Sequence, residues 1–459
     1  MNKFLLSCAL MLTAITASAT DYSSYYENLP ISIAQVQQPV ISGPTYDIKD
    51  HGAIGDGIFD CTKIIQTAID NISAKGGGKV SIPAGIWLTS PITLKSGINL
   101  HLAKGAILII TPDRTKHLKV GATKPMHGIS ALGCKNVSLT GDGIINGNGE
   151  YWRAAKHSKY SDTEWEYLKS LGGITAQKGT DEIWYPYDLH SLPNFAESVA
   201  KQESLRQSVV YFNGCENALI SGVTIKDSPK FHLEIEDCQN IIVDGVTLNC
   251  AWNAQNGDGI VLKTSQQVLI VNNVIDCGND GISLKAATGK RAFDHKPTKD
   301  VVIADNTVLY AHGGFDIGSE FASGISNVCV YNNVLLSTET GLRFKSFTSR
   351  GGKTDNIYIW NILMDKVKDE AIGFETDYVN EAIYKTEGSV GTEWVPEFQD
   401  IHIYNVTCNR ARIGISAKGA RGTIHDIDIH DCTIVYTNTN TDIDPDCGVT
   451  VKNVTLKKF

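Results

Sequence analysis

Short runs of apolar, mostly β-branched residues, separated by Gly and Asn, recur along the chain. From about residue 125 a loose unit repeats, in which Cys-x-Asn-Val is followed by Gly or Asn and another short apolar run; clear copies begin at Cys134, Cys215 and Cys238. The strand-like runs lie at 222–225, 245–248, 273–275, 333–335, 361–363, 405–407 and 453–455. Equivalent positions are 23 to 28 residues apart, as from Val223 to Val246 and from Val246 to Val274.

Strands this short cannot bury a face alone, but they can do so when stacked on one another. A period in the twenties with several strands per repeat therefore predicts an all-β fold, a parallel β-helix. Leucine-rich repeats are disfavoured because their Leu spacing is missing, and a propeller needs a longer period and antiparallel strands. Equivalent residues of successive coils would stack ~4.8 Å apart in ladders of Asn, Cys and Val. We therefore interpret Cys215, Cys238, Cys250 and Cys277 as buried free thiols rather than disulfide partners.

The N-terminal part of the repeat region needs a cap, because a β-helix exposes strand edges at its ends. We expect a capping helix that Asp60 begins, followed by the glycine run 76–78 and a strand over 79–82. The apolar residues of this helix keep a spacing of three or four: Ile64, Ile65, Ala68 and Ile69.

One long interruption of the repeat runs from about Tyr151 to Gln207. We interpret it as an excursion over one face of the stack. It is rich in aromatic residues, namely Trp152, Trp165, Tyr167, Trp184, Tyr185 and Tyr187. Two interpretations stay open for these side chains: local packing within the excursion, or a wall of a binding groove.

The first 19 residues are typical of an export signal. Lys3 is followed by a mostly apolar run over 4–15, and Ala17-Ser18-Ala19 forms a cleavage motif before Thr20. We therefore expect residues 1–19 to be a signal peptide, residues 20–459 to form a single β-helix domain, and the protein to be exported to the periplasm or the medium. No later segment reaches the ~20 apolar residues that a membrane span requires, so we expect no membrane association.

Composition narrows the possible partners. The chain is 42% hydrophobic, which is ample for a buried core, and carries 41 Lys and Arg against 50 Asp and Glu, a net charge of -9. An acidic chain of this kind does not favour nucleic acid as a partner. We expect a monomer, and no spacing of metal ligands or cofactor motif stands out.

Two aspartates, Asp258 and Asp280, are the leading candidates for chemistry. They are 22 residues apart, about one coil, so we expect them to be neighbours on adjacent coils. Two close carboxylates repel, which raises one pKa and leaves the other group ionised. Such a pair suits glycoside hydrolysis, which needs a proton donor and a base or nucleophile around one bond. The alternative is that both are ordinary turn residues beside glycines.

Three basic side chains extend this pattern to the following coils. Arg343 and Lys345 alternate, so on a strand both project to one face, where they would hold a carboxylate or sulfate. The alternative is a solvated basic face. His312 stands before two glycines and is either a turn residue or part of the same groove. Their occurrence on consecutive coils favours the groove.

The four clusters resemble the motifs of the polygalacturonases of glycoside hydrolase family 28, which are written N-T-D, G-D-D, G-H-G and R-I-K. The matching stretches are Asn256-Gly257-Asp258, Gly278-Asn279-Asp280, His312-Gly313 and Arg343-Phe344-Lys345. Residues 47–57 also resemble the opening segment of this superfamily, and 150–153 agree with the family as well. The resemblance implies a right-handed parallel β-helix of the pectin-lyase-like kind.

The resemblance also implies a reaction, the inverting hydrolysis of α-1,4 bonds between galacturonic acid units of an acidic plant-type polysaccharide or oligosaccharide, without a cofactor. Asp258 and Asp280 would activate the attacking water, and His312 would hydrogen-bond near the carboxylates and tune their protonation. The implied substrate-binding residues are Asn256, Asn279, Lys285, Arg343 and Lys345, although Lys285 could equally be a solvated rim residue.

One position departs from the family. Asn279 stands where relatives carry the aspartate that donates the proton, and general acid catalysis is typically worth 10²–10⁴-fold, ~3–5 kcal/mol of barrier. Three hypotheses follow. Asp258 or Asp280 has become the acid; another carboxylate, Asp316 or Glu320, reaches in; or the protein is a weak or inactive glycan binder.

Two other enzyme types remain open beside plain polygalacturonate hydrolysis. A rhamnogalacturonan-type hydrolase would act on a related backbone with the same residues. A calcium-dependent pectate lyase would use carboxylates to bind Ca²⁺ and a basic residue to abstract the proton. The order of the four motifs favours hydrolysis over elimination.

Overall fold

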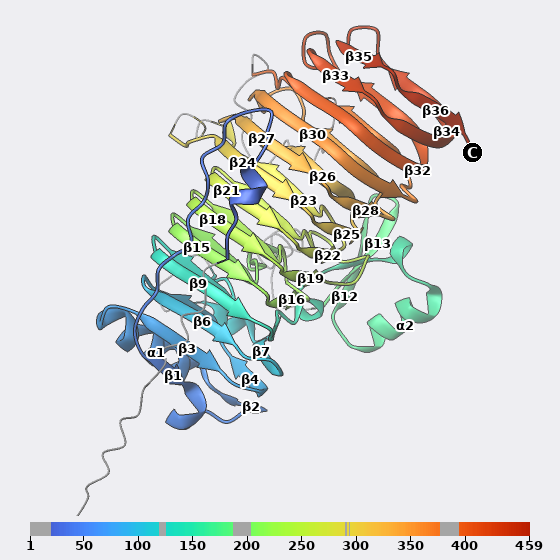
Figure 1. Ribbon diagram of the computed structural model, residues 1–459. Coiled ribbons are helices and arrows are strands. Elements are labelled where there is room, and N and C mark those ends of the chain that lie inside the picture. Colours follow the sequence, from blue (N-terminus) through green and yellow to red (C-terminus); the bar gives the residue numbers. More distant parts are fainter. Residues whose placement is uncertain (1–19, 119–124, 187–202, 290–291, 293, 377–393) are drawn as a thin grey trace, which may run out of the picture.

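The structure, a computed structural model, describes residues 20–118, 125–186, 203–289, 292, 294–376 and 394–459. The expected signal peptide and Tyr187 lie outside these residues. The described strands form one 33-stranded sheet and a separate three-stranded sheet. Figure 1 shows the strands of the large sheet stacked coil upon coil along a single axis. Within the described part of the chain, no helix is long and apolar enough to cross a bilayer.

The strands of the coils form three faces, because each strand pairs in parallel with its equivalent on the next coil. Face 1 contains β5 (Ile92–Leu94), β8 (Ile129–Leu132), β14 (Val210–Asn213), β17 (Leu233–Glu236), β20 (Ile260–Lys263), β23 (Ile282–Lys285), β26 (Gly313–Gly318), β29 (Thr340–Lys345) and β31 (Glu370–Glu375). Face 2 contains β1 (Thr45–Asp47), β3 (Gly78–Ile82), β6 (Ile98–Leu102), β9 (Lys135–Gly141), β15 (Glu216–Ser221), β18 (Gln239–Asp244), β21 (Gln266–Val271), β24 (Thr298–Ala304), β27 (Ile325–Tyr331), β33 (Ile427–His430) and β35 (Val449–Lys452). Face 3 contains β2 (Asp56–Asp60), β4 (Gly85–Thr89), β7 (Ala106–Ile110), β10 (Ile144–Asn146), β16 (Thr224–Lys226), β19 (Thr247–Asn249), β22 (Val274–Asp276), β25 (Thr307–Tyr310), β28 (Val334–Leu336), β34 (Thr433–Ile443) and β36 (Thr455–Lys458). Three long strands continue from one face into the next: β30 (Thr354–Asp365), β32 (Ile401–Lys418) and β34.

The interior of the coils is a continuous apolar core. Strand residues alternate between the interior and the outside, as in β6, where Ile98, Leu100 and Leu102 are fully buried. The buried cluster extends from Ile48 near the start of the described chain to Cys447 near its end. The predicted parallel β-helix is therefore confirmed, and its stability comes from stacking coils rather than from any one coil.

The predicted ladders are present at defined corners. Asn273, Asn306 and Asn333 are almost fully buried between faces 2 and 3. The Asn273 amide donates to Asn306 Oδ1 at 2.8 Å, and the Asn306 amide donates to Asn333 Oδ1 at 3.0 Å. Each buried amide thus satisfies the next. The ten cysteines of the described residues are all buried and free, which confirms the prediction of free thiols.

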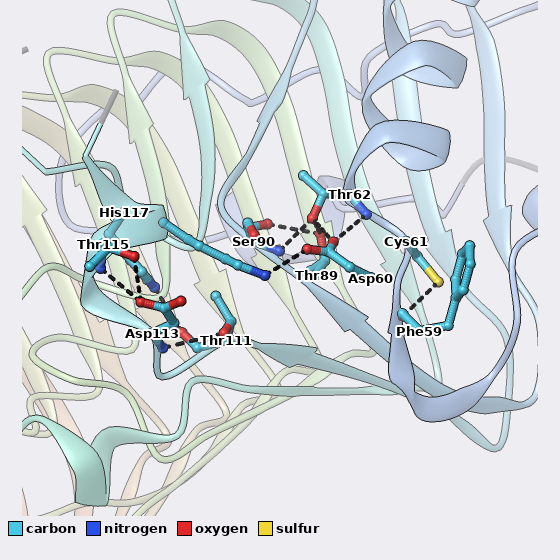
Figure 2. Close-up of polar contacts among 11 residues, drawn as sticks. Phe59, Asp60, Cys61, Thr62, Thr89, Ser90, Thr111, Asp113, Thr115 and His117 are labelled. Atoms are coloured by element: carbon cyan, nitrogen blue, oxygen red, sulfur yellow. Dashed lines mark hydrogen bonds and ion pairs between the residues drawn. The ribbon is translucent and has the colours of Figure 1, made fainter. Parts of the chain in front are cut away.

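The N-terminal cap is a helix, α1 (Thr62–Ala74), as predicted. Its N-cap residue is Cys61 rather than the expected Asp60, which lies one position earlier. Asp60 still contributes, because its Oδ1 accepts from the Thr62 amide at 3.0 Å, and the Thr62 hydroxyl accepts from the Ser90 amide at 2.6 Å (Figure 2). This chain of contacts ties the start of the helix to the end of β4.

Residues 20–43, for which no element was expected, run across the outer surface of face 2 (Figure 1). We call this segment the strap. Tyr22, Ile33 and Val36 pack on outward apolar side chains of β18, β21, β24 and β27. The Tyr22 hydroxyl donates to Asp244 Oδ2 at 2.9 Å.

The excursion contains a second small sheet. The strands of this sheet are β11 (Ala155–Lys156), β12 (Ile174–Lys178) and β13 (Asp181–Tyr185), and the helix α2 (Asp162–Ser170) lies between β11 and β12 in the chain. Figure 1 shows the excursion standing out from the side of the stack. Of the predicted aromatic residues, Trp152, Trp165, Trp184 and Tyr185 are buried, which favours local packing, while Tyr167 is exposed. The excursion also approaches the coils, since Lys159 lies 6.0 Å from the ring of Trp252.

Candidate active site

A cavity of about 410 Å³ opens on face 1, over β20, β23 and β29. All eight residues that the sequence singled out line it: Asn256, Asp258, Asn279, Asp280, Lys285, His312, Arg343 and Lys345. The cavity is also lined by residues that the sequence did not single out, among them Lys230, Lys263 and His295. The structure thus brings every sequence-predicted site residue together, whereas their chemical roles remain a proposal.

Strand register explains why these residues meet. Lys263 on β20 pairs with Lys285 on β23, and Asp316 on β26 pairs with Arg343 on β29. Side chains at these alternate positions point out of the coil, while their neighbours fill the core. Arg343 and Lys345 therefore project to the same side, as their spacing predicted.

The two aspartates lie in the turns that lead into β20 and β23. The amide of Gly259 donates to the Asp280 carbonyl at 2.9 Å, so the turns stack directly on one another. A side chain at Gly259 would approach the Gly281 carbonyl to 2.5 Å, and one at Gly281 would approach the Gly314 carbonyl to 2.8 Å. Glycine after each aspartate is therefore required by close coil stacking.

Asp280 is held by two cations. Lys345 Nζ lies 2.6 Å from Asp280 Oδ2, and Arg343 Nη1 lies 3.7 Å from Oδ1. Burial alone raises the pKa of Asp280, but the charges of Lys345, Lys285 and Arg343 outweigh it and leave this pKa well below its ordinary value. Asp280 is therefore ionised over the whole physiological range.

Asp258 has the opposite character. Its side chain is almost fully buried, and its Oδ1 has no hydrogen-bond partner in the structure. Burial, and then the negative charge of Asp280, raise the pKa of Asp258 far above its ordinary value. One carboxyl of the pair thus holds a proton at moderately acidic pH while the other is charged, which is the arrangement of an acid beside a base.

The asparagines are fixed by different contacts. Arg206, at the end of the excursion, donates to Asn256 Oδ1 at 2.9 Å and pairs with Glu203 at 2.7 Å. The Asn279 carbonyl accepts from the amide of His312 at 3.0 Å, so Asn279 and His312 lie on adjacent coils. Sequence reasoning missed Arg206, because nothing in its local pattern links it to a turn 50 residues later.

His312 has a partner that the sequence did not predict. The resemblance implied a hydrogen bond near the aspartates, but the structure places His312 Nε2 3.6 Å from Glu339 Oε1. Burial lowers the pKa of His312, although the charges of Glu339 and Asp280 oppose this effect. The imidazole therefore faces Glu339 on the next coil, while the charge of Asp280 acts on it through space.

Lys285 and Glu320 form a buried ion pair. Lys285 Nζ lies 2.7 Å from the Gly318 carbonyl and 3.0 Å from Glu320 Oε2, and Arg350 Nη1 lies 3.0 Å from Glu320 Oε1. Burial raises the pKa of Glu320, but Lys285 and Arg350 overcome this and lower it. Lys285 is thus a buried cavity residue and not a solvated rim residue, and Glu320 is too firmly ionised to be the proton donor.

A third aspartate, Asp316, lies next to this group. Its side chain is fully buried, and Lys345 Nζ lies 3.5 Å from its Oδ1. Burial, and then the charge of Asp280, raise the pKa of Asp316. From sequence, Asp316 is only one of several candidate acids, but in the structure it is an immediate neighbour of the Asp280 and Lys345 pair.

The donor set does not fit a calcium site. The ammonium of Lys345 lies between Asp280 and Asp316, in contact with both carboxylates. A cation held by these oxygens would meet that ammonium directly. Within the described residues, no group of three or more His, Cys, Asp or Glu side chains is arranged to hold a metal ion. The position of the Lys345 ammonium between the carboxylates disfavours the calcium-dependent lyase hypothesis.

Comparison with known proteins identifies the family of this chain. The model of the family described as glycosyl hydrolases family 28 matches residues 194–445, more than half of the chain. The chain is 29% identical over 378 residues to an exo-poly-alpha-D-galacturonosidase of Dickeya chrysanthemi, a match covering 79% of this chain and 61% of that relative. It is 26% identical over 405 residues to an endo-polygalacturonase of Pectobacterium carotovorum subsp. carotovorum, covering 86% and 87%.

A solved structure is similar along nearly its whole length. The hyperthermoactive exopolygalacturonase of Thermotoga maritima aligns with a TM-score of 0.76 and 26% sequence identity, covering 92% of this chain and 94% of that one. The fold shared with such neighbours is the right-handed parallel β-helix, as the resemblance implied. The chain spans less than two thirds of the length of the Dickeya chrysanthemi relative.

Proposed function

Because the chain belongs to glycosyl hydrolase family 28, we propose that it cleaves the α-1,4 bonds between galacturonic acid units of pectin, or of a related acidic pectic backbone, with inversion at the anomeric carbon. The observation that carries this proposal is the unequal pair of aspartates in one cation-lined cavity. Asp280 is ionised beside Lys345, and Asp258 retains its proton one coil away.

The pair provides both halves of the reaction. Asp258 gives its proton to the glycosidic oxygen as the bond from that oxygen to the anomeric carbon breaks. Asp280 accepts a proton from the water whose oxygen forms the new bond to the same carbon. Solvent then restores the proton to Asp258 and removes the proton from Asp280. This assignment replaces the donor that relatives carry at the position of Asn279.

The cavity also suits a polyanionic substrate. Lys230, Lys263, Lys285, Arg343 and Lys345 all line it, on a chain whose net charge is -9. These five cations outnumber the four acidic residues of the lining, Glu236, Asp258, Asp280 and Glu320, so the cavity suits carboxylates better than the rest of the acidic chain does. In this proposal Arg343, whose planar fork matches a carboxylate, holds a galacturonate carboxyl beside the bond that is cleaved.

Release of reducing ends from polygalacturonate tests the function, with rhamnogalacturonan as the parallel substrate. We expect product from at least one of them and a fall of ~10²–10⁴-fold in Asp258→Asn. The matched control is Asp276→Asn, the same change on β22 of face 3, away from the cavity. No product from either substrate, or an undiminished rate in Asp258→Asn, would refute the proposal.

The stereochemical part has its own test. Proton NMR of the first product, recorded before mutarotation, distinguishes inversion from retention. We expect the β anomer to accumulate first from an α-linked substrate. Early appearance of the α anomer contradicts inversion while leaving hydrolysis intact.

A second candidate is a glycan-binding protein that does not turn over its ligand. The observation that favours it is Asn279, because an amide at the donor position of relatives cannot deliver a proton. Calorimetry with oligogalacturonides separates the candidates. Tight binding with no sugar release over days supports the binder, and release that depends on Asp258 supports the hydrolase.

We further propose that the protein is exported and that residues 1–19 are removed. The support is the basic start, the apolar run and the Ala17-Ser18-Ala19 motif. N-terminal sequencing of protein recovered from the periplasm or medium should begin at Thr20. Protein that stays in the cytoplasm with Met1 intact would contradict export.

A further inference from the structure

Asp316 occupies a position where the fold has no need of a charge. It is on β26 of face 1, between the core residues Phe315 and Ile317, and its side chain points out of the coil. The equivalent residue on β23 is Ser283, which pairs with Asp316 in register. Asp316 is nevertheless fully buried, because the neighbouring groups of the site cover it.

The backbone leaves a space for this carboxyl. A side chain at Gly313 would collide with both carboxylate oxygens of Asp316, so the carboxyl rests against the α-carbon of Gly313. The φ of Gly313 lies outside the left-handed region, so its backbone conformation does not call for glycine. Glycine at this position, directly after His312, therefore provides room for Asp316.

Neither oxygen of Asp316 has a hydrogen-bond partner in the structure. A buried carboxyl without partners is costly, and a serine, as on β23, would fill this place more cheaply. The closest charge is the Lys345 ammonium, 3.5 Å from Asp316 Oδ1 and 2.6 Å from Asp280 Oδ2. This carboxyl therefore lowers the stability of the fold, and its presence points to a role in the site.

The groups that face Asp316 come from three coils. Asp280 and Lys285 belong to the coil of β23, and Arg343 and Lys345 belong to β29. Asp258, one coil before Asp280, also experiences the negative charge of Asp316, which helps to raise its pKa. Asp316 is therefore placed to influence both members of the proposed acid and base pair.

We propose that Asp316 is a positioning residue of the hydrolytic centre, which shares the Lys345 ammonium with Asp280 and keeps the proton on Asp258. It does not touch the substrate, because it is fully buried and does not line the cavity. It compensates electrostatically for Asn279, because it keeps the remaining acid, Asp258, protonated to higher pH. This inference rests on the function proposed above.

The direction of its effect follows from charge. Burial and the charge of Asp280 raise the pKa of Asp316 as well, so Asp316 becomes charged only in the range where Asp258 also ionises. In that range its charge disfavours ionisation of Asp258, so the pKa of Asp258 is higher than it would be without Asp316. Asp316→Asn removes that charge with little change of shape, so the pKa of Asp258 falls. It also leaves Lys345 wholly to Asp280. Both changes shift to lower pH the range in which Asp258 is protonated and Asp280 is ionised.

The test compares pH profiles of kcat/KM for the wild type, Asp316→Asn and Ser283→Ala. We expect Asp316→Asn to move the basic limb down by at least ~0.5 pH unit, with a plateau within ~3-fold of the wild type and little change in KM. Ser283→Ala is the matched control, since it alters the adjacent buried residue of the same outward row without a change of charge. A loss of rate at all pH values without a shift of the limb would overturn the inference, since that is the signature of a merely structural role.

A second pair of variants tests the packing. Gly313→Ala should displace the Asp316 carboxyl and shift the limb in the same direction. In an Asp316→Ala background the same glycine change should have no further effect on the limb. Additive shifts in the double variant would contradict the contact on which the inference depends.

A measurement without turnover separates this inference from the proposed function. The carboxyl carbons of ¹³C-labelled aspartate report the titration midpoint of Asp258, assigned with Asp258→Asn. We expect a lower midpoint in Asp316→Asn than in the wild type. A lowered midpoint in a protein that releases no sugar would refute the hydrolase and leave the link between the two aspartates standing. An unchanged midpoint would overturn the link, whether or not sugar is released.

Discussion

Two stacks of buried polar residues lie on successive coils of this β-helix, but one is satisfied by hydrogen bonds and the other is not. Asn273, Asn306 and Asn333 are neighbours on successive coils and almost fully buried, and each amide donates to the next. Asp258 and Asp280 are also neighbours on successive coils and as deeply buried, yet each keeps an oxygen without a hydrogen-bond partner. The solenoid therefore stabilises amides by stacking them and activates carboxylates by the same stacking.

The difference lies in whether two identical side chains can form hydrogen bonds with each other. An amide carries both donors and an acceptor, so identical residues satisfy one another along a ladder. An ionised carboxylate carries only acceptors, so identical residues repel and need cations or protons. In this site Lys345 stabilises one member of the stack, and a proton stabilises another.

The largest expected effect comes from turning the charged stack into an amide stack. Asp280→Asn removes the base and the partner of Lys345, and we expect kcat to fall by ~10³-fold. The thermal midpoint should fall as well, because the buried Lys345 ammonium loses its partner at 2.6 Å, so rates are compared well below the melting transition of the variant. Initial rates on polygalacturonate together with a melting curve check this. Activity retained within tenfold would show that Asp280 is not the base.

The reverse exchange should cost stability. Asn306→Asp places a carboxyl in the middle of the amide ladder, and we expect a loss of roughly 3 kcal/mol in the free energy of unfolding near neutral pH. Burial without a cation would raise the pKa of the new group above its unfolded value. The loss should therefore be small below pH 4 and should grow as pH rises through that unfolded value. Urea unfolding at pH 4 and pH 8 measures it, and an equal loss at both would contradict the argument.

The pH dependence of the wild type sharpens the comparison. Burial, and then Asp280, raise the pKa of Asp258 to about 7, so the acid loses its proton above that pH. The pKa of Asp280 is lowered, so the base stays ionised far into the acidic range. We expect kcat/KM to be flat between about pH 4 and 7 and to fall about tenfold per unit above it. A basic limb below pH 5 would exclude Asp258 as the acid.

The smallest expected effect concerns the position where this chain departs from its relatives. If Asp258 is the acid, with Asp316 in support, Asn279→Asp adds a carboxyl that the mechanism does not need. We expect kcat to stay within ~3-fold of the wild type or to fall, because a further like charge perturbs the existing pair. A gain of a hundredfold or more would mean that the natural chain lacks a proper acid.

Much of this arrangement follows from sequence because it depends on periodicity. The 22-residue interval predicted that Asp258 and Asp280 are coil neighbours, and alternation predicted that Arg343 and Lys345 share a face. A repeat fold converts sequence spacing into spatial register, so local reasoning reaches far along the chain.

The residues that sequence reasoning missed or underrated act through contacts outside that register. Arg206 reaches Asn256 from the end of the excursion, and Glu339 takes the imidazole of His312 from the neighbouring coil. Asp316 is an outward residue between two apolar ones, and only the covering side chains make it buried. The sequence period does not predict such contacts, because they depend on tertiary packing and not on the repeat.

The strap has a consequence for the order in which the molecule assembles. Its Tyr22 binds Asp244, 222 residues away, and the Tyr331 hydroxyl donates to the carbonyl of Tyr25, 306 residues away. Contacts so distant along the chain form slowly, because long loops must close first. The residues that leave the ribosome early are therefore among the last to find their places, and the outer side of face 2 stays bare until the middle coils exist.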